Sequence, residues 1–278
     1  MPWQYSEEYY REYTRTTWNE SAEAYLDFMR NLEPFRADLI ARLGPAIGEN
    51  ILDMGTGPGQ PALTVATLVG PTGHVTGIDL SEKMIEIAKR IGASQSPGNT
   101  DFRVMDCSTL QFPDEAFDAI ISSFGFQIFT NPEKAAQEAR RVLTPSGRIA
   151  VSVWSTGDQV PALHAIVGPM LVHAEPDETG YIPTPYETGG PGEMVAFLEK
   201  AGFQNCQETR VRHPMRFENE DGYLESILKG TPIGHSLSEE PQEVQREVLR
   251  ETRKNLQAWK GPGGISIPAE CVLVVGHR

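Results

Sequence analysis

Acidic residues stand at the ends of three short apolar stretches in the first half of the chain. Asp53 ends the stretch ILD, Asp79 ends VTGID and Asp106 ends FRVMD. Asp53 is followed by three glycines at alternate positions, which are Gly55, Gly57 and Gly59. A loop of this composition lets the backbone come close to a ligand. Together these residues predict a site for a nucleotide-like molecule.

The spacing of the glycines excludes two common phosphate-binding loops. The dinucleotide fingerprint G-x-G-x-x-G requires a third glycine at position 60, where the chain has Gln60. A P-loop requires a Lys-Ser or Lys-Thr pair after the glycines, and none follows here. A nicotinamide-dependent dehydrogenase is therefore disfavoured.

Strands and helices alternate from about residue 50 onward, and this order positions the acidic residues. Apolar stretches predict strands at 50–55, 74–80, 101–106, 117–125, 148–154, 205–217 and near the C-terminus. Helical patterns occupy 61–70, 81–93, 131–143 and 193–203. Ser81 and Asn131 are the expected N-caps of the second and third of these helices. Such alternation predicts a parallel sheet with helices on both faces, and ligands bind beyond the carboxyl ends of its strands.

The remaining segments surround this sheet. We expect an α-helical N-terminal cap at 1–48 and a second unit at 49–278. Within the second unit, Pro, Gly and Thr predict a lid loop at about 157–192, and a helical insertion is expected at about 218–262, before the last strand. The predicted fold class is α/β, with a seven-stranded, mostly parallel, doubly wound sheet.

Composition narrows the class of protein. The chain has 278 residues, 39% of them hydrophobic, and a formal net charge of −14. Nucleic-acid binding rests on Lys and Arg neutralising phosphates, so this charge disfavours nucleic-acid partners. No apolar run is long enough to span a bilayer, and the N-terminus lacks the pattern of a signal peptide. Three dispersed cysteines suggest no disulfide framework, and a cytoplasmic location is expected.

The stretch ILDMGTGPG resembles the glycine loop of class I S-adenosylmethionine-dependent methyltransferases. More closely, the chain looks like the small-molecule methyltransferases related to the ubiquinone/menaquinone C-methyltransferases. Three further motifs carry the resemblance: VTGIDLS, VMDCSTLQFPDEAFDAI and SSFGFQIFTNPEKAAQEARRVLTPSGRIAVSVW. It is strong from about 50 to 155 and weaker elsewhere. It implies a Rossmann-like fold, S-adenosyl-L-methionine as cofactor, and methyl transfer to a small organic acceptor.

The resemblance also implies roles for the polar residues. Asp53 and the three glycines would surround the amino acid end of the cofactor. Asp79 would accept hydrogen bonds from the ribose hydroxyls, Asp106 would meet the adenine amino group, and Cys107 would offer its backbone N–H to the ring. Structural alternatives stay open: Gly55 and Gly59 can serve turn geometry, Asp79 can cap a helix, and Asp106 can brace a turn.

Further positions follow from the same motifs. Leu80 and Met84 would pack near the adenine or ribose, although Met84 fits the core equally well. The residues expected where the fourth strand opens toward the methyl group are Ser122, Ser123 and Phe124.

The acceptor site is expected outside the sheet, in the N-terminal helices, the lid loop and the insertion. The aromatic residues in these segments suit an apolar or aromatic acceptor: Trp3, Tyr5, Tyr9, Tyr10, Tyr13, Trp18, Tyr25, Tyr181, Tyr186 and Tyr223. His164 is the first candidate for a general base, ahead of His173, His213 and His235. No ligand cluster suggests a metal, and a metal-independent enzyme is expected.

Two other functions remain possible from the sequence. One is an enzyme that keeps the cofactor pocket for different chemistry, such as a cyclisation. The other is a non-catalytic cofactor-binding regulator. The expected partner is a small-molecule acceptor, and the chain is expected to be a monomer or a homodimer without stable membrane insertion.

Overall fold

A mixed sheet in the order β3-β2-β1-β4-β5-β8-β6, with the short β7 beside β8, forms the centre of the computed structural model. The structure describes residues 7–95, 98–174, 186 and 188–278. The strands are β1 (Asn50–Met54), β2 (His74–Asp79), β3 (Thr100–Val104), β4 (Phe117–Ser123), β5 (Leu143–Trp154), β6 (Gln204–Phe217), β7 (Lys260–Gly261) and β8 (Gly264–His277). The first five are parallel, and β8 runs antiparallel to both β5 and β6.

Alternate residues of the buried strands face opposite layers of helices, as the two-residue period of a strand requires. Ile51 and Ile121 belong to the core on the side of α2 (Glu33–Leu43), α3 (Ala62–Val69) and α4 (Glu82–Gln95). Leu52 and Ile120 belong to the core on the side of α5 (Pro132–Val142) and α7 (Glu193–Lys200). The doubly wound α/β fold predicted from the sequence is therefore confirmed.

Two predicted helix caps are present. The Ser81 hydroxyl accepts a hydrogen bond from the Met84 N–H at 3.1 Å, at the start of α4. The Asn131 side chain accepts one from the Lys134 N–H at 3.0 Å, at the start of α5. Each cap satisfies a backbone donor that the first helical turn leaves without a partner.

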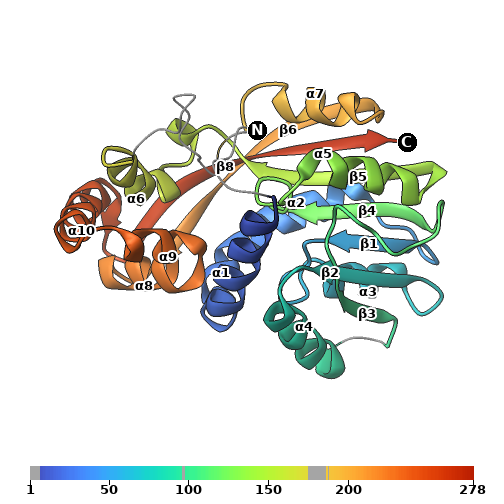
Figure 1. Cartoon of the computed structure of the whole chain (residues 1–278), viewed down its shortest axis with the longest axis horizontal. Helices are drawn as coiled ribbons and strands as arrows, with labels where there is room; N and C mark the ends of the chain where they lie inside the picture. Colours follow the sequence, from blue (N-terminus) through green and yellow to red (C-terminus); the bar gives the residue numbers. More distant parts are fainter. Residues whose placement is uncertain (1–6, 96–97, 175–185, 187) are drawn as a thin grey trace.

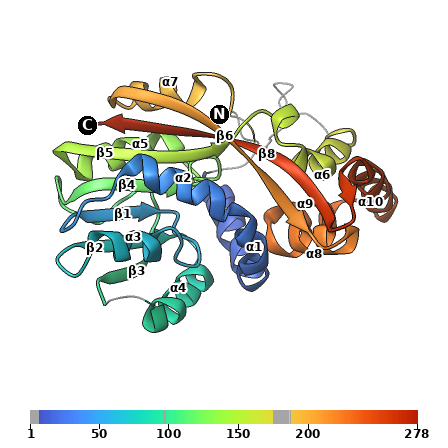
Figure 2. The same ribbon diagram turned by 180° about the vertical axis from the view of Figure 1, so that it is seen from behind.

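The C-terminal end of β6 and the N-terminal end of β8 extend together beyond the parallel strands. They reach a group of four helices, α6 (Pro161–Leu171), α8 (Glu220–Gly230), α9 (Pro232–Glu239) and α10 (Gln242–Leu256) (Figures 1 and 2). The helices α8 to α10 lie between β6 and β8 in the chain, which confirms the expected helical insertion. The N-terminal helix α1 (Glu7–Phe28) lies between this group and α4. It packs on α4 on one side and on α8 and α9 on the other.

The predicted lid loop at about 157–192 needs a correction, because residues Pro161–Leu171 form α6. Pro161 occupies the first turn, where proline is tolerated, and Leu163, Ile166 and Val167 recur at helical spacing and are buried. Residues 175–185 and 187 lie outside the described residues.

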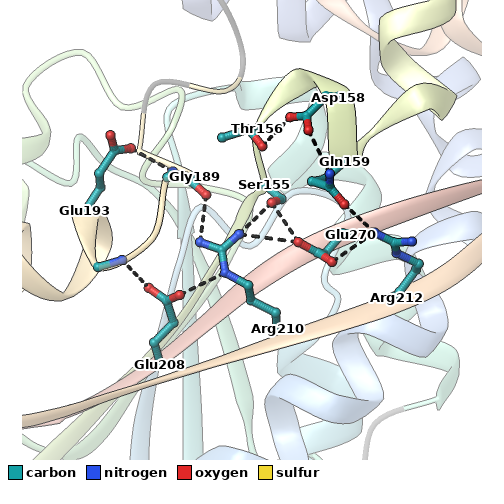
Figure 3. A network of polar contacts seen from close by, with 12 residues as sticks. Ser155, Thr156, Asp158, Gln159, Gly189, Glu193, Glu208, Arg210, Arg212 and Glu270 are labelled. Atoms are coloured by element: carbon teal, nitrogen blue, oxygen red, sulfur yellow. Dashed lines mark hydrogen bonds and ion pairs between the residues drawn. The ribbon is translucent and has the colours of Figure 1, made fainter.

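Arg210 on β6 binds the backbone at Gly189, which precedes α7 in the chain (Figure 3). The Arg210 guanidinium donates to the Gly189 carbonyl at 3.0 Å and to Glu208 at 2.9 Å. A Cβ at Gly189 would lie 2.1 Å from the Trp154 carbonyl oxygen, so the segment passes too close to the end of β5 for a side chain. This close approach and the Arg210 contacts fix the position of Thr188, which lines the cavity described below.

Candidate active site

A cavity of about 860 Å³ opens at the carboxyl ends of the parallel strands. Its walls come from the glycine loop, from the ends of β2, β4 and β5, from the residues that follow β2, β3 and β4, and from α1, α5, α6, α7, α9 and α10. This is the edge of the sheet at which α/β folds bind ligands. The cavity therefore joins the predicted cofactor loop to the helical part of the chain.

Asp53 braces the glycine loop from below. Its Oδ2 atom accepts hydrogen bonds from the Thr56 hydroxyl at 2.7 Å and from the Ala62 N–H at 3.1 Å. The side chain is fully buried and is not part of the cavity wall, and its Oδ1 atom has no hydrogen-bond partner among the described residues. Burial raises the pKa of this carboxyl to about 7. Asp53 thus orients the loop directly.

The three glycines divide between two tasks. Gly55 and Gly57 line the cavity, and both have positive φ angles. Gly59 does not line it, and a Cβ there would lie 3.1 Å from Leu63 in α3 and 3.3 Å from Ala88 in α4. Gly59 therefore permits close packing of two helices, while the other two present backbone to the cavity.

Asp79 lines the cavity at the end of β2. Its carboxylate oxygens accept hydrogen bonds from the Gly57 N–H and the Ser81 N–H, each at 2.9 Å. Burial raises the pKa of this carboxyl, and the backbone hydrogen bonds oppose that effect. Leu80 and Met84 line the same wall.

Asp106 and Cys107 line the cavity after β3. Asp106 accepts two hydrogen bonds from Ser108, from its N–H and its hydroxyl, each at 2.7 Å. Its second oxygen lies 3.0 Å from Nε of Arg11 on α1. Burial raises the pKa of the Cys107 thiol well above its usual range, so this thiol is not poised as a nucleophile.

Of the three residues predicted at the end of β4, two line the cavity and one does not. Ser123 and Phe124 line the cavity, whereas Ser122 does not. Ser122 is fully buried and donates a hydrogen bond to the Met54 carbonyl at 2.7 Å, so it joins β4 to β1. Phe124 has a φ of 58° and packs against Trp154 with ring centroids 4.2 Å apart.

The helical side of the cavity is mostly apolar. Tyr9, Tyr10, Tyr13, Trp18 and Tyr25 of α1 line it, as the sequence predicted for this helix. The aliphatic part of this wall consists of Leu163, Val167, Met170, Leu171, Ile233, Leu237, Val244 and Val248.

Other aromatic candidates lie elsewhere. Tyr223 is fully buried, and its hydroxyl donates to the Ala162 carbonyl at 2.9 Å, so it packs α8 against α6. Tyr186 is not among the lining residues. Trp3, Tyr5 and Tyr181 lie outside the described residues.

The prediction for His164 is not supported by its position. The side chain is exposed on α6, and the lining residues Leu163 and Val167 occupy a different face of this helix. The other three candidate histidines also stand outside the described cavity wall and approach carboxylates: His173 with Glu247, His213 with Asp38, and His235 with Glu20.

Two of the cavity residues that sequence reasoning missed are joined to each other. Gln127 and Trp154 both line the cavity, and they are joined by a hydrogen bond from the Trp154 N–H to Gln127 Oε1 at 2.8 Å. Both belong to segments that the motifs covered, but their pairing depends on how β4 and β5 lie side by side.

The donor set of the cavity fits S-adenosylmethionine. The charged residues in its described wall are all acidic: Asp79, Asp106, Glu133, Glu239 and Glu240. This charge suits a ligand that carries a sulfonium and an ammonium. Gly55 and Gly57 allow close approach of the ligand's amino acid end, and the half-buried Asp79 suits its ribose.

Two negative findings concern the described residues. No cluster of three or more His, Cys, Asp or Glu side chains there has the arrangement of a metal site. No helix in the same part of the chain is both long and apolar enough to cross a bilayer.

Comparison with known proteins identifies the domain. Residues 51–147 match the methyltransferase domain family. A ubiquinone/menaquinone biosynthesis C-methyltransferase of Geotalea daltonii is 31% identical over 137 residues, which are 47% of this chain and 58% of the relative. A nocamycin O-methyltransferase of Saccharothrix syringae is 28% identical over 185 residues, 63% of this chain and 66% of the relative.

The structure of the YcgJ protein from Bacillus subtilis has the same fold. It superimposes with a TM-score of 0.60 at 19% identity, and the match covers 87% of this chain and 97% of that protein. That match shows the fold alone, whereas the sequence matches identify residues 51–147 as a methyltransferase domain related to the ubiquinone/menaquinone C-methyltransferases. The expected family and cofactor are therefore confirmed. The chain spans 58% and 66% of the two relatives' lengths.

Proposed function

We propose that the protein transfers a methyl group from S-adenosylmethionine to a small organic acceptor through an O, N, C or S nucleophile. The observation that carries this proposal is the single cavity that runs from the glycine loop and Asp79 to the apolar wall of α6, α9 and α10. One end suits the cofactor, and the other has room for an apolar or aromatic molecule.

The chain's own residues contribute binding, alignment and exclusion of water. Asp79 holds the ribose, Gly55 and Gly57 admit the amino acid end, and the aromatic residues of α1 cover the cavity. When bound, the cofactor supplies an electrophilic methyl group. An electron pair of the acceptor, a lone pair or the π pair of a carbon nucleophile, would form the new bond to the methyl carbon while the carbon–sulfur pair would stay on sulfur. An acceptor that carries a proton on the nucleophile releases it to water.

Alignment of the two reactants is the main catalytic contribution that this cavity offers. Holding reactants in line accounts for about 7–11 kcal/mol of a barrier in favourable cases. No histidine or lysine lies in the described wall of the cavity. The mechanism is therefore one of positioning, without a dedicated nitrogen base.

A transfer assay tests the proposal. The full chain is incubated with methyl-labelled cofactor and a panel of phenols, quinols, amines and thiols, and both labelled product and S-adenosylhomocysteine are quantified. We expect equal amounts of the two with at least one acceptor class. Tight cofactor binding without transfer to any acceptor would instead favour cyclisation-type chemistry or a regulator.

The remaining partner properties belong to the same proposal. We propose a small-molecule acceptor and no nucleic-acid partner, a cytoplasmic location, and a monomer or homodimer.

A further inference from the structure

The segment that follows β4 lies against the glycine loop. A Cβ at Gly55 would lie 3.1 Å from the Phe129 ring and 3.6 Å from Cα of Gly125. The intervening Gln127 lines the cavity. Gln127 therefore occupies the part of the wall next to the expected amino acid end of the cofactor, where the methyl group is presented.

The orientation of the Gln127 amide is set by its neighbour on β5. The Trp154 N–H donates to Oε1 at 2.8 Å, and an oxygen is required to accept that bond. The other amide atom is then the NH₂ group, which is a donor only. This nitrogen has no hydrogen-bond partner among the described residues, and Gln127 is only partly buried.

Trp154 is itself held firmly. Its ring packs on Phe124 at 4.2 Å and on Phe35 at 5.5 Å, and its side chain is buried. The anchor of the Gln127 amide is therefore a rigid part of the sheet edge. A donor fixed in this way loses little conformational entropy when it binds a ligand.

The charge of the wall limits what this donor can bind. Every charged residue in the described wall is acidic, and Leu163, Val167 and Val248 make its far end apolar. The described wall offers an anionic acceptor no protein cation and would repel it through its carboxylates, so only the cofactor's own positive charge could offset the loss of water. An uncharged molecule with an apolar body meets no such penalty.

We propose that the acceptor is an uncharged, largely apolar molecule with a hydrogen-bond-accepting oxygen at or beside the methylated atom, and that Gln127 donates to this oxygen. The inference rests on the proposed function and narrows its acceptor class. Gln127 is the specificity-determining residue, because its NH₂ group selects an oxygen acceptor and aligns the adjoining nucleophile.

A binding experiment on the full chain saturated with S-adenosylhomocysteine tests this inference. The probes are 4-octylphenol, which is uncharged at neutral pH, and octanoate, which is anionic. Calorimetry should show 4-octylphenol binding at least about tenfold more tightly than octanoate. Octanoate binding as tightly as the phenol, or the absence of binding by either probe, would overturn the proposed acceptor class.

The variant Gln127→Glu tests the NH₂ group of Gln127 while keeping the oxygen that binds the Trp154 N–H. It keeps an oxygen for the Trp154 N–H but replaces the NH₂ group with a second acceptor. We expect 4-octylphenol affinity to fall by at least about fivefold, as for the loss of one hydrogen bond, and S-adenosylhomocysteine affinity is measured alongside it to detect any disturbance of the cofactor end. Gln204→Glu adds the same charge on an exposed part of β6 and should change neither affinity.

Unchanged phenol affinity in Gln127→Glu would overturn the role of Gln127. If this variant loses cofactor binding, Gln127→Met, which adds no charge, is used in its place. We expect the same fall in 4-octylphenol affinity. The outcomes are distinguishable from failure of the proposed function. Label transferred to an anionic acceptor refutes only the acceptor class, whereas absence of transfer to every compound refutes methyl transfer.

Discussion

Nε of Arg11 lies 3.0 Å from Oδ2 of Asp106, so α1 is tied by an ion pair to the residue expected to hold the adenine. A second tie lies further along α1, where Asn19 Oδ1 accepts hydrogen bonds from the Ser81 hydroxyl at 2.6 Å and the Lys83 N–H at 3.1 Å. Helix α1 is thus a wall of the cofactor end of the cavity as well as of its apolar end. Cofactor binding at Asp106 must compete with Arg11.

Because Arg11 competes with the cofactor for Asp106, replacing Arg11 should change cofactor affinity. Arg11 is 42% exposed, so its ion pair contributes no more than about 1 kcal/mol. We expect Arg11→Gln to tighten S-adenosylhomocysteine binding by about two- to fivefold in calorimetry. Arg90→Gln removes another ion pair between α4 and α1, away from Asp106, and should leave the affinity unchanged. A tenfold loss in Arg11→Gln would show that Arg11 itself binds the cofactor.

Replacement of Asp79 tests the position of the ribose. Asp79→Ala removes a carboxylate that faces the cavity and that also holds the Gly57 and Ser81 N–H groups. We expect cofactor affinity to fall by at least about tenfold, because a charge-assisted hydrogen bond is lost. Asp101→Ala, at the partly exposed start of β3 and outside the cavity wall, is the matched control. Equal affinities of the two variants would place the ribose elsewhere.

Asp53 predicts a pH dependence of stability. Its pKa is raised by burial from 3.8 to about 7, so the unfolded carboxyl ionises first as the pH rises. Its contribution to the free energy of unfolding is therefore fully present below about pH 4 and is lost as the pH approaches 7.

Urea denaturation of the wild type and Asp53→Asn between pH 4 and pH 8 checks this sign. The stability of the wild type relative to the variant should decrease with rising pH, by at most about 4 kcal/mol. A difference that does not vary with pH, or that grows in favour of the wild type, would contradict the raised pKa.

A chelator should leave methyl transfer unaffected. The described residues contain no cluster of side chains suited to a metal, and in-line displacement at a sulfonium needs no Lewis acid at the methyl group. Activity is compared before and after dialysis against EDTA, with and without added Mg²⁺ or Zn²⁺. Activity that disappears on dialysis and returns with one metal would refute the metal-independent mechanism.

Much of the fold was predictable because its signals are local. Strand-length apolar stretches ending at Asp53 and Asp79, and caps such as Ser81, depend on neighbours within a few residues. Helix α6 was assigned to the lid loop, because the Pro- and Gly-rich residues further along dominated the composition of that segment. Its apolar face is covered by α10 and β8, which come much later in the chain.

At the edge of the sheet, the site was predictable where a motif lies within one strand and its following loop. Gly55, Asp79 and Asp106 line the cavity as expected. The bond between Gln127 and Trp154 joins residues 27 positions apart, so only the pairing of β4 with β5 reveals it. The spacing of Leu163, Ile166 and Val167 places His164 off the buried face of α6, but this follows only once residues 161–171 are recognised as a helix.

A crystal structure of the full chain with S-adenosylhomocysteine tests the central claim most directly. We predict that both ribose hydroxyls lie within hydrogen-bonding distance of Asp79 and that the sulfur faces Gln127 across the cavity. A ligand bound away from Asp79, or a sulfur that faces away from the apolar wall, would contradict the account.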